Sequence, residues 1–247
     1  MTIVLASAWI PYVAPIKDAG IAGQFKFLTR RGPWVILAAV FTGNAGVFCW
    51  WSYVSPWLQK TGGWSSSLVP MLMMLAGFGM VIGGLLGGRL TDHWRHAGAA
   101  AIGQSISCLG LLLVLITPGN QPMTAVLTFW IAIGLFFTSA PQQLLMTEAG
   151  QGGGELIAGA AVQVAFNFGN AIGSIVGGAM LTTFSMNYRY TGLGGMPLAL
   201  LAVGLLAFYS WRCETDTDAI HACAKPRWTE TKLTANSLTR LFTVLID

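Results

Sequence analysis

Five long stretches of the chain lack Asp, Glu, Lys and Arg, and the segments between them hold every charged residue and all three histidines. The uncharged stretches are 32–59, 61–88, 97–147, 156–188 and 190–211. A helix needs about 20 mostly apolar residues to cross the hydrocarbon core of a bilayer, so 97–147 is long enough for two crossings and each of the others for one. The pattern predicts six membrane-spanning helices.

Turn-forming residues indicate where these helices end. The segment 118–122, which reads PGNQP, divides the longest stretch, and the segment 151–154, which reads QGGG, opens the fifth helix. The predicted helices cover about 34–58, 68–90, 97–117, 123–146, 156–184 and 191–211. The predicted fold class is therefore all-α integral membrane, with a six-helix transmembrane bundle at 33–211.

The two ends of the chain lie outside the predicted bundle. Residues 1–13 are apolar but are interrupted at Pro11 and are too short to cross a bilayer. We expect them to be the end of a truncated transmembrane helix; the alternative, the apolar part of a signal peptide, lacks a basic region before it and a small-residue cleavage site after it. Residues 14–32 are predicted to be a cytoplasmic linker and 212–247 a cytoplasmic tail.

The basic residues are divided unequally between the two sides of the bundle. Of the 13 Lys and Arg residues, only Lys60 and Arg189 fall on one side. Because cytoplasmic loops of membrane proteins are enriched in Lys and Arg, the other side is predicted to be cytoplasmic. The net charge of +4 then reports orientation in the bilayer and not binding to nucleic acid. We expect a multi-pass protein of a bacterial inner membrane, with the tail in the cytoplasm.

Composition excludes several other classes. Only 9% of the residues are charged, against about 25% in soluble domains, which excludes a water-soluble globule. The four cysteines have neither metal-ligand spacing nor the pattern of a disulfide framework, so no metal and no cofactor is expected. A membrane-embedded protease would need a His within a helix, and all three histidines lie outside the predicted helices. We therefore do not expect an enzyme.

Glycines recur at every fourth position in two of the predicted helices. The second helix contains Gly79, Gly83 and Gly87, and the fifth contains Gly169, Gly173 and Gly177. Such a row of glycines lets a neighbouring backbone approach closely and favours association of helices in lipid. Two interpretations remain open at this point: static packing, or smooth faces along which helices slide during transport.

Amide side chains form a stripe in the fifth predicted helix. At 100° per residue, Gln163, Asn167, Asn170 and Ser174 lie on one face. In the first predicted helix, Asn44, Trp51 and Ser55 share a face by the same arithmetic, and Gln142 lies near one end of the fourth helix.

Two interpretations of these polar residues remain open. Asn44 and Asn167 both lie about 15 Å into the membrane, the depth at which transporters bind substrates. The candidate pathway residues for a neutral, hydroxyl-rich or amphipathic solute are Asn44, Trp51, Ser55, Gln142, Gln163, Asn167 and Asn170. Alternatively, the amides among them join helices by hydrogen bonds. Gln142 could line an inner vestibule or merely follow a kink at Pro141.

The connection between the second and third predicted helices contains a carboxylate between two arginines. It includes Gly88, Arg89, Leu90, Asp92 and Arg95. The pattern resembles the Gly-x-Leu-x-Asp-x-x-x-Arg loop signature of the major facilitator superfamily, although Arg95 stands one position early. We therefore treat Gly88, Arg89, Asp92 and Arg95 as a candidate gating loop.

The resemblance extends over about residues 1–211. The segments that carry it are 25–28 (FKFL), 43–48 (GNAGVF), 51–54 (WSYV), 139–141 (SAP) and 165–169 (AFNFG). They resemble the second half of the arabinose-efflux branch of that superfamily. The resemblance implies twelve helices in two repeats, a central cavity, and proton-coupled export of sugars or drugs. The six predicted helices would then be helices seven to twelve.

The first repeat of that family has no counterpart in this sequence. Alternating access moves one repeat against the other around a shared site, and the five uncharged stretches contain no Asp, Glu, Lys, Arg or His to carry a proton. We expect a carboxy-terminal half that is inactive alone and whose partners are the lipid bilayer, a small solute and a separate amino-terminal half. The alternative is a homo-oligomeric, channel-like or regulatory membrane subunit.

Overall fold

A computed structural model describes residues 24–116, 119–151 and 154–214. The predictions for 1–13, for the first part of the linker 14–32 and for nearly all of the tail 212–247 lie outside the described residues. Within the described part, every regular element is a helix and none is a strand. Six helices are long and apolar enough to cross a membrane. The predicted all-α membrane fold is confirmed.

The six long helices agree closely with the predicted ones. They are α3 (Arg31–Trp51), α5 (Val69–His93), α6 (His96–Ile116), α7 (Gln121–Ala149), α8 (Glu155–Thr183) and α9 (Thr191–Cys213). Three short elements accompany them: α4 (Val54–Lys60) and the 3-10 turns η1 (Lys26–Thr29) and η2 (Tyr188–Tyr190). The first predicted helix is the exception, because it is divided into α3 and α4 by a turn at Ser52 and Tyr53.

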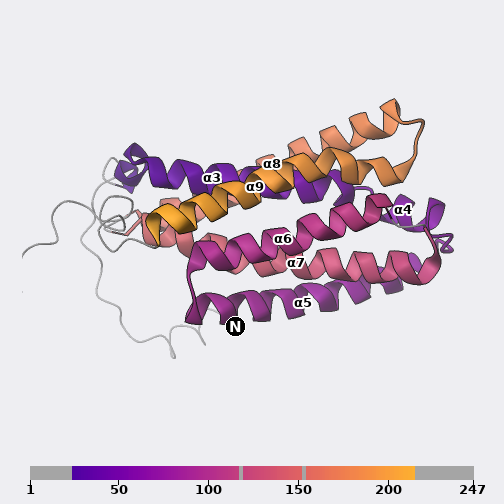
Figure 1. Cartoon of the computed structure of the whole chain (residues 1–247), viewed down its shortest axis with the longest axis horizontal. Helices are drawn as coiled ribbons and strands as arrows, with labels where there is room; N and C mark the ends of the chain where they lie inside the picture. The colour runs from indigo at the N-terminus through magenta and orange to yellow at the C-terminus, as the bar shows by residue number, and fades with distance from the viewer. Residues whose placement is uncertain (1–23, 117–118, 152–153, 215–247) are drawn as a thin grey trace, which may run out of the picture.

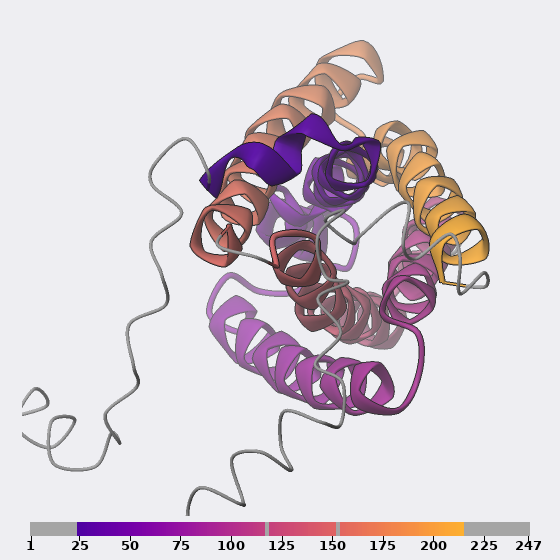
Figure 2. The same cartoon turned by 90° about the vertical axis from the view of Figure 1, so that its left-hand side faces the viewer.

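The helices form two groups of three that pack side by side (Figure 1). In one group α3 packs against α8 and α9, and in the other α7 packs against α5 and α6. Contacts of α6 with α9, and of α7 with α3 and α8, join the two groups. In the end view, α5 and α8 lie at the periphery of the bundle, each against one main neighbour (Figure 2).

Two hydrophobic clusters occupy opposite ends of the bundle. One contains Ile36, Met146 and Leu206, which are each at most 1% exposed. The other contains Trp50 and Trp57, whose rings meet edge to face with centroids 5.0 Å apart. The residues of α3 and α7 that separate the clusters lie at the middle of the bundle.

The α5 glycines lie directly against the backbone of α7. A Cβ at Gly79, Gly83 or Gly87 would come too close to the carbonyl oxygens of Phe129, Ile133 and Phe137, respectively. The neighbouring Gly84 has open space where a Cβ would be. The row at intervals of four is therefore the face of α5 that contacts α7.

The α8 glycines repeat this arrangement on α3. A Cβ at Gly169, Gly173 or Gly177 would come too close to the carbonyl oxygens of Phe41, Ala45 and Cys49. In both pairs a row of three glycines faces three carbonyls that are also four residues apart, on a helix near the centre of the bundle. In lipid the hydrophobic effect does not drive helices together. The van der Waals contact that such a close backbone approach provides supplies the attraction instead.

We predict opposite effects of alanine at two adjacent glycines of α5. Gly83→Ala forces a methyl group against the Ile133 carbonyl and should lower stability by about 1–3 kcal/mol, as overpacking does. Gly84→Ala meets no atom and should leave stability unchanged or raise it by up to about 1 kcal/mol through helix propensity. Thermal unfolding of the two purified variants in one detergent measures the difference, and equal melting temperatures would contradict this packing.

Candidate functional site

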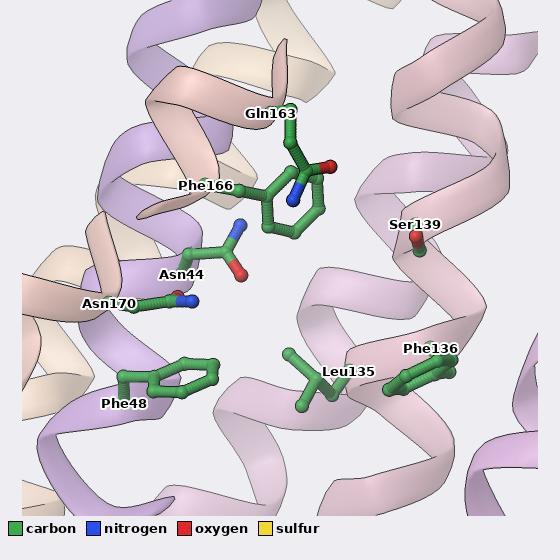
Figure 3. Close-up of a pocket in the computed structure, with 8 residues that line it drawn as sticks. All are labelled: Asn44, Phe48, Leu135, Phe136, Ser139, Gln163, Phe166 and Asn170. Atoms are coloured by element: carbon green, nitrogen blue, oxygen red, sulfur yellow. The ribbon is translucent and has the colours of Figure 1, made fainter. Parts of the chain in front are cut away.

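A pocket of about 230 Å³ lies between α3, α7 and α8. Its lining residues lie within 44–48 of α3, 135–139 of α7 and 163–170 of α8. They are Asn44, Phe48, Leu135, Phe136, Ser139, Gln163, Phe166 and Asn170 (Figure 3). The lining contains amides, one hydroxyl and apolar side chains, with no ionisable residue. The structure thus brings together Asn44, Gln163 and Asn170, three of the pathway residues predicted from the sequence.

Asn44 is the most deeply buried polar residue of the pocket. Its side chain is 4% exposed, and its Nδ2 donates a hydrogen bond of 2.9 Å to the carbonyl oxygen of Val40, one helical turn earlier. Its Oδ1 has no partner among the described residues. The side chain projects from α3 toward the pocket (Figure 3). Asn44 therefore carries a hydrogen-bond acceptor that the described residues leave without a donor.

The α8 wall carries the other two amides. Gln163 is exposed and extends from α8 across the pocket in the direction of α7, whereas Asn170 is half-buried beside Asn44 (Figure 3). The Oδ1 of Asn170 also has no partner among the described residues. Phe166 lies above Asn44 and Asn170, beside Gln163, and Phe48 lies below them, so that two aromatic rings provide flat apolar surfaces (Figure 3). The arrangement suits a small neutral molecule with both polar and apolar faces.

Beyond Phe48, hydrogen bonds join α3 and α8. The hydroxyl groups of Ser52 and Ser174 lie 2.6 Å apart, and the Tyr53 hydroxyl donates to the carbonyl oxygen of Ser174 at 2.9 Å. In an uninterrupted helix over 34–58, Tyr53 would lie on the face opposite Asn44. The turn at Ser52 and Tyr53 ends that helix and directs the Tyr53 side chain toward α8 instead.

The other predicted pathway residues are not among those that line the pocket. Asn167 is exposed, and its Nδ2 donates to the carbonyl oxygen of Gln163 at 2.8 Å. Trp51 packs against Trp50, with ring centroids 5.9 Å apart. Ser55 lies beyond the turn in α4, where its Oγ accepts from Gln59 at 3.3 Å.

Two buried glutamines flank the pocket without lining it. Gln142 is 1% exposed, and neither atom of its amide group has a partner among the described residues. It therefore lies inside the bundle and not on an open vestibule. Gln104 on α6 is 3% exposed and donates to the carbonyl oxygen of Gly43 at 3.4 Å. Its position was not predicted, since a lone Gln in an apolar helix gives no sequence signal.

The candidate gating loop is mostly helical. Because α5 continues to His93, Gly88, Arg89 and Asp92 belong to its last turns, and Arg95 lies in the short link to α6. Asp92 is exposed and forms no ion pair with Arg89 or Arg95, both of which are described. The carboxylate and the two arginines of the candidate gating loop therefore do not pair with one another in this structure.

Different residues tie the helices together at this end. His96 Nδ1, at the start of α6, lies 3.1 Å from Glu148 Oε2 near the end of α7. The backbone N–H of Ala97 donates to Glu214 Oε1 at 2.8 Å, and Ser210 donates to the other oxygen of the same carboxylate. A carboxylate at the N-terminus of a helix accepts hydrogen bonds from the free N–H groups of the first turn and interacts favourably with the positive end of the helix dipole. Sequence reasoning missed these contacts because they join residues far apart in the chain.

Comparison with known proteins identifies the family. Residues 2–156 match the model of the Major Facilitator Superfamily. The chain is 38% identical over 201 residues to the Escherichia coli (strain K12) protein named "Putative transporter AraJ", covering 81% of this chain and 50% of that protein. It is also 28% identical to the inner membrane transport protein YdhP of the same strain, over 74% of this chain and 46% of YdhP.

A third relative comes from a distant bacterium. The Bacillus subtilis (strain 168) protein named "Uncharacterized MFS-type transporter YbcL" is 24% identical to this chain, over 81% of this chain and 51% of its own length. The chain thus spans about half the length of these relatives. It belongs to the major facilitator superfamily, as the resemblance predicted, and this family is one of multi-pass membrane transporters.

We predict that water reaches the pocket but not the outer faces of α6 and α9. In a background without cysteine, Ser139→Cys in the pocket should react with a water-soluble maleimide in intact membranes. Ser105→Cys, on an exposed and almost wholly apolar groove between α6 and α9, should react far more slowly because lipid covers it. Similar labelling rates at the two positions would contradict a hydrated pocket.

Proposed function

We propose that this chain forms the carboxy-terminal half of an exporter of sugars or small amphipathic solutes in a bacterial inner membrane. The observation that carries the proposal is an uncharged pocket at the middle of a major facilitator bundle, lined by Asn44, Gln163 and Asn170. Secondary transporters bind substrates near the midplane, where helices of two repeats meet. The names of the relatives, which are transporters, support the same activity.

The size of the pocket favours a small solute over a drug-sized one. Pockets for drug-sized ligands usually have about 300–1,000 Å³ and enclose most of the ligand surface. This pocket has about 230 Å³, and Gln163 at its rim is exposed. The remaining contacts to the solute would come from a second half of the transporter.

The exposed faces of α5 and α8 support a second half. In an apolar stretch of 18 residues, only 28% of α5 is buried, and in the corresponding stretch of α8 only 22% is buried. The open face of α8 carries the amides Gln163 and Asn167 beside Phe168, which is 64% exposed. Amides on a membrane helix usually face protein or a water-filled cavity and not lipid. We therefore place the amino-terminal half over α8 and α5, whether it belongs to the same polypeptide or to another.

In this proposal the six helices move as one body against the amino-terminal half. The glycine contacts of α5 with α7 and of α8 with α3 join backbones directly, which favours static packing within the half over sliding. None of the residues that line the pocket is ionisable. In this proposal the residue that carries the proton therefore belongs to the other half. Gly88, Arg89, Asp92 and Arg95 would gate by contacting that half at the cytoplasmic end.

We predict that the chain alone does not catalyse proton-driven transport. Purified and reconstituted into liposomes, it should show no uptake of radiolabelled pentose when a pH gradient is imposed, because in this proposal the other half supplies one wall of the site and the proton carrier. A full-length relative in matched liposomes is the positive control for the gradient. Robust gradient-driven uptake by the single chain would contradict the half-transporter proposal.

A separate prediction tests whether the open faces instead join two copies of this chain. Phe78 on α5 is 65% exposed and Ile175 on α8 is 67% exposed, so cysteines there report contacts across these faces. The proposal predicts no efficient disulfide between copies carrying Phe78→Cys or Ile175→Cys in native membranes. A single symmetric dimer, captured at low expression, would favour the alternative of a homo-oligomeric channel-like or regulatory subunit.

A further inference from the structure

We propose that Asn44 selects solutes that carry hydrogen-bond donors, above all hydroxyl groups, through its side-chain oxygen Oδ1. This inference rests on the proposed function and adds to it a residue that determines specificity. It follows from the orientation of one amide, from its burial, and from the lack of a partner for its oxygen.

The orientation of the Asn44 amide is fixed by its own helix. Nδ2 donates to the carbonyl oxygen of Val40 at 2.9 Å. A carbonyl oxygen only accepts hydrogen bonds, so turning the amide over would place Oδ1 against the oxygen of Val40 and repel it. One N–H of Nδ2 is therefore committed to the helix, and this fixes Oδ1 on the side of the pocket.

Packing holds the stem of this side chain in place. Asn44 is 4% exposed, and α8 passes so close that a Cβ at Gly169 would lie 3.0 Å from the Asn44 Cβ. The glycine row of α8 thus sets the depth at which Asn44 lies beneath the pocket. A rigidly held acceptor loses little conformational entropy when a ligand binds to it.

The Oδ1 atom of Asn44 is buried and has no partner among the described residues. Asn170, whose Oδ1 is also buried and without such a partner, lies beside it on the pocket wall (Figure 3). A solute reaches the Asn44 oxygen by displacing a neighbouring side chain such as Asn170. A buried acceptor without a donor is costly, so a hydroxyl group that reaches it gains more than it would at a solvated amide.

This geometry discriminates between donors and acceptors. A solute with ether or carbonyl oxygens alone leaves the Asn44 oxygen unsatisfied, whereas a polyol donates to it and can accept from the amide nitrogens of Asn170 and Gln163. Sites built to pair with a substrate hydroxyl reject analogues that lack it more strongly than apolar pockets reject a change of size. The pocket is thus predicted to prefer hydroxylated solutes over their methyl ethers.

The test compares a methyl pentopyranoside, which has three free hydroxyl groups, with its tri-O-methyl ether. Binding of each to the full chain in nanodiscs is measured by saturation-transfer NMR titration. We expect the hydroxylated compound to bind about tenfold more tightly, the lower part of the range for one unsatisfied buried acceptor. In Asn44→Leu, which removes the acceptor at similar volume, this ratio should fall to near one.

A matched variant controls for the loss of a buried amide. Gln104→Leu also removes a buried amide that bonds to α3, but it does so outside the pocket, and the tenfold ratio should persist. Because the ratio compares two ligands on one preparation, a lower folding yield in either variant cancels. A ratio that survives in Asn44→Leu, or that is lost in Gln104→Leu, would overturn the role of Asn44.

Binding of the two pentosides to the wild-type chain distinguishes failure of this inference from failure of the proposed function. Equal binding of the two pentosides would overturn donor selection while leaving a solute pocket intact. Binding of neither compound at concentrations up to about 100 mM, well beyond weak carrier affinities of about 1 mM, would overturn both.

Discussion

Direct contact between helix backbones is the interaction on which the rest of this structure depends. Helices surrounded by lipid gain nothing from the hydrophobic effect by associating, so close packing must supply the attraction. Here each peripheral helix, α5 or α8, places three glycines against carbonyls that lie four residues apart on α7 or α3. A single Cβ in either row would push the helices apart.

The same contacts position the pocket. Because Gly169 and Gly173 bring α8 against α3, the amide of Asn170 lies beside that of Asn44 at the middle of the bundle. The separation of α8 from α7 beyond that seam leaves the space that Ser139, Phe136 and Leu135 line from the other side. Helix α8 thus uses one face, which carries the glycines, to pack against α3, and another face, which carries the amides, to line the pocket.

Much of this organisation could be predicted from the sequence because its causes are local. Charges cannot remain at the centre of a bilayer, so their absence marks the spans, and a repeat of four marks a helix face. The amide stripe of α8 was predicted by the same arithmetic, and Gln163 and Asn170 do line the pocket. Family membership was visible in short local motifs and agrees with the match over residues 2–156.

What could not be predicted depends on contacts between distant segments. The turn at Ser52 breaks the helical register, so Ser55 lies in α4 and Tyr53 reaches Ser174. The apolar residues Phe48 and Phe166 line the pocket, yet an aromatic residue in a membrane helix looks the same from sequence whether it faces lipid or a cavity. The pairing of His96 with Glu148 joins α6 to α7, and the sequence does not show how these two helices lie relative to one another.

The pocket and the packing of α5 both require α7 to cross the bilayer. Helix α7 supplies one wall of the pocket and the carbonyl groups that the α5 glycines contact. The most direct measurement is the sidedness of two exposed positions at its ends, Asn120 and Gln151, replaced one at a time by cysteine in a cysteine-free chain. An impermeant maleimide added to intact cells is predicted to label the cysteine at 120 and to label that at 151 only after the membrane is opened. Labelling of both positions from the same side would contradict the six-helix membrane bundle and the pocket built within it.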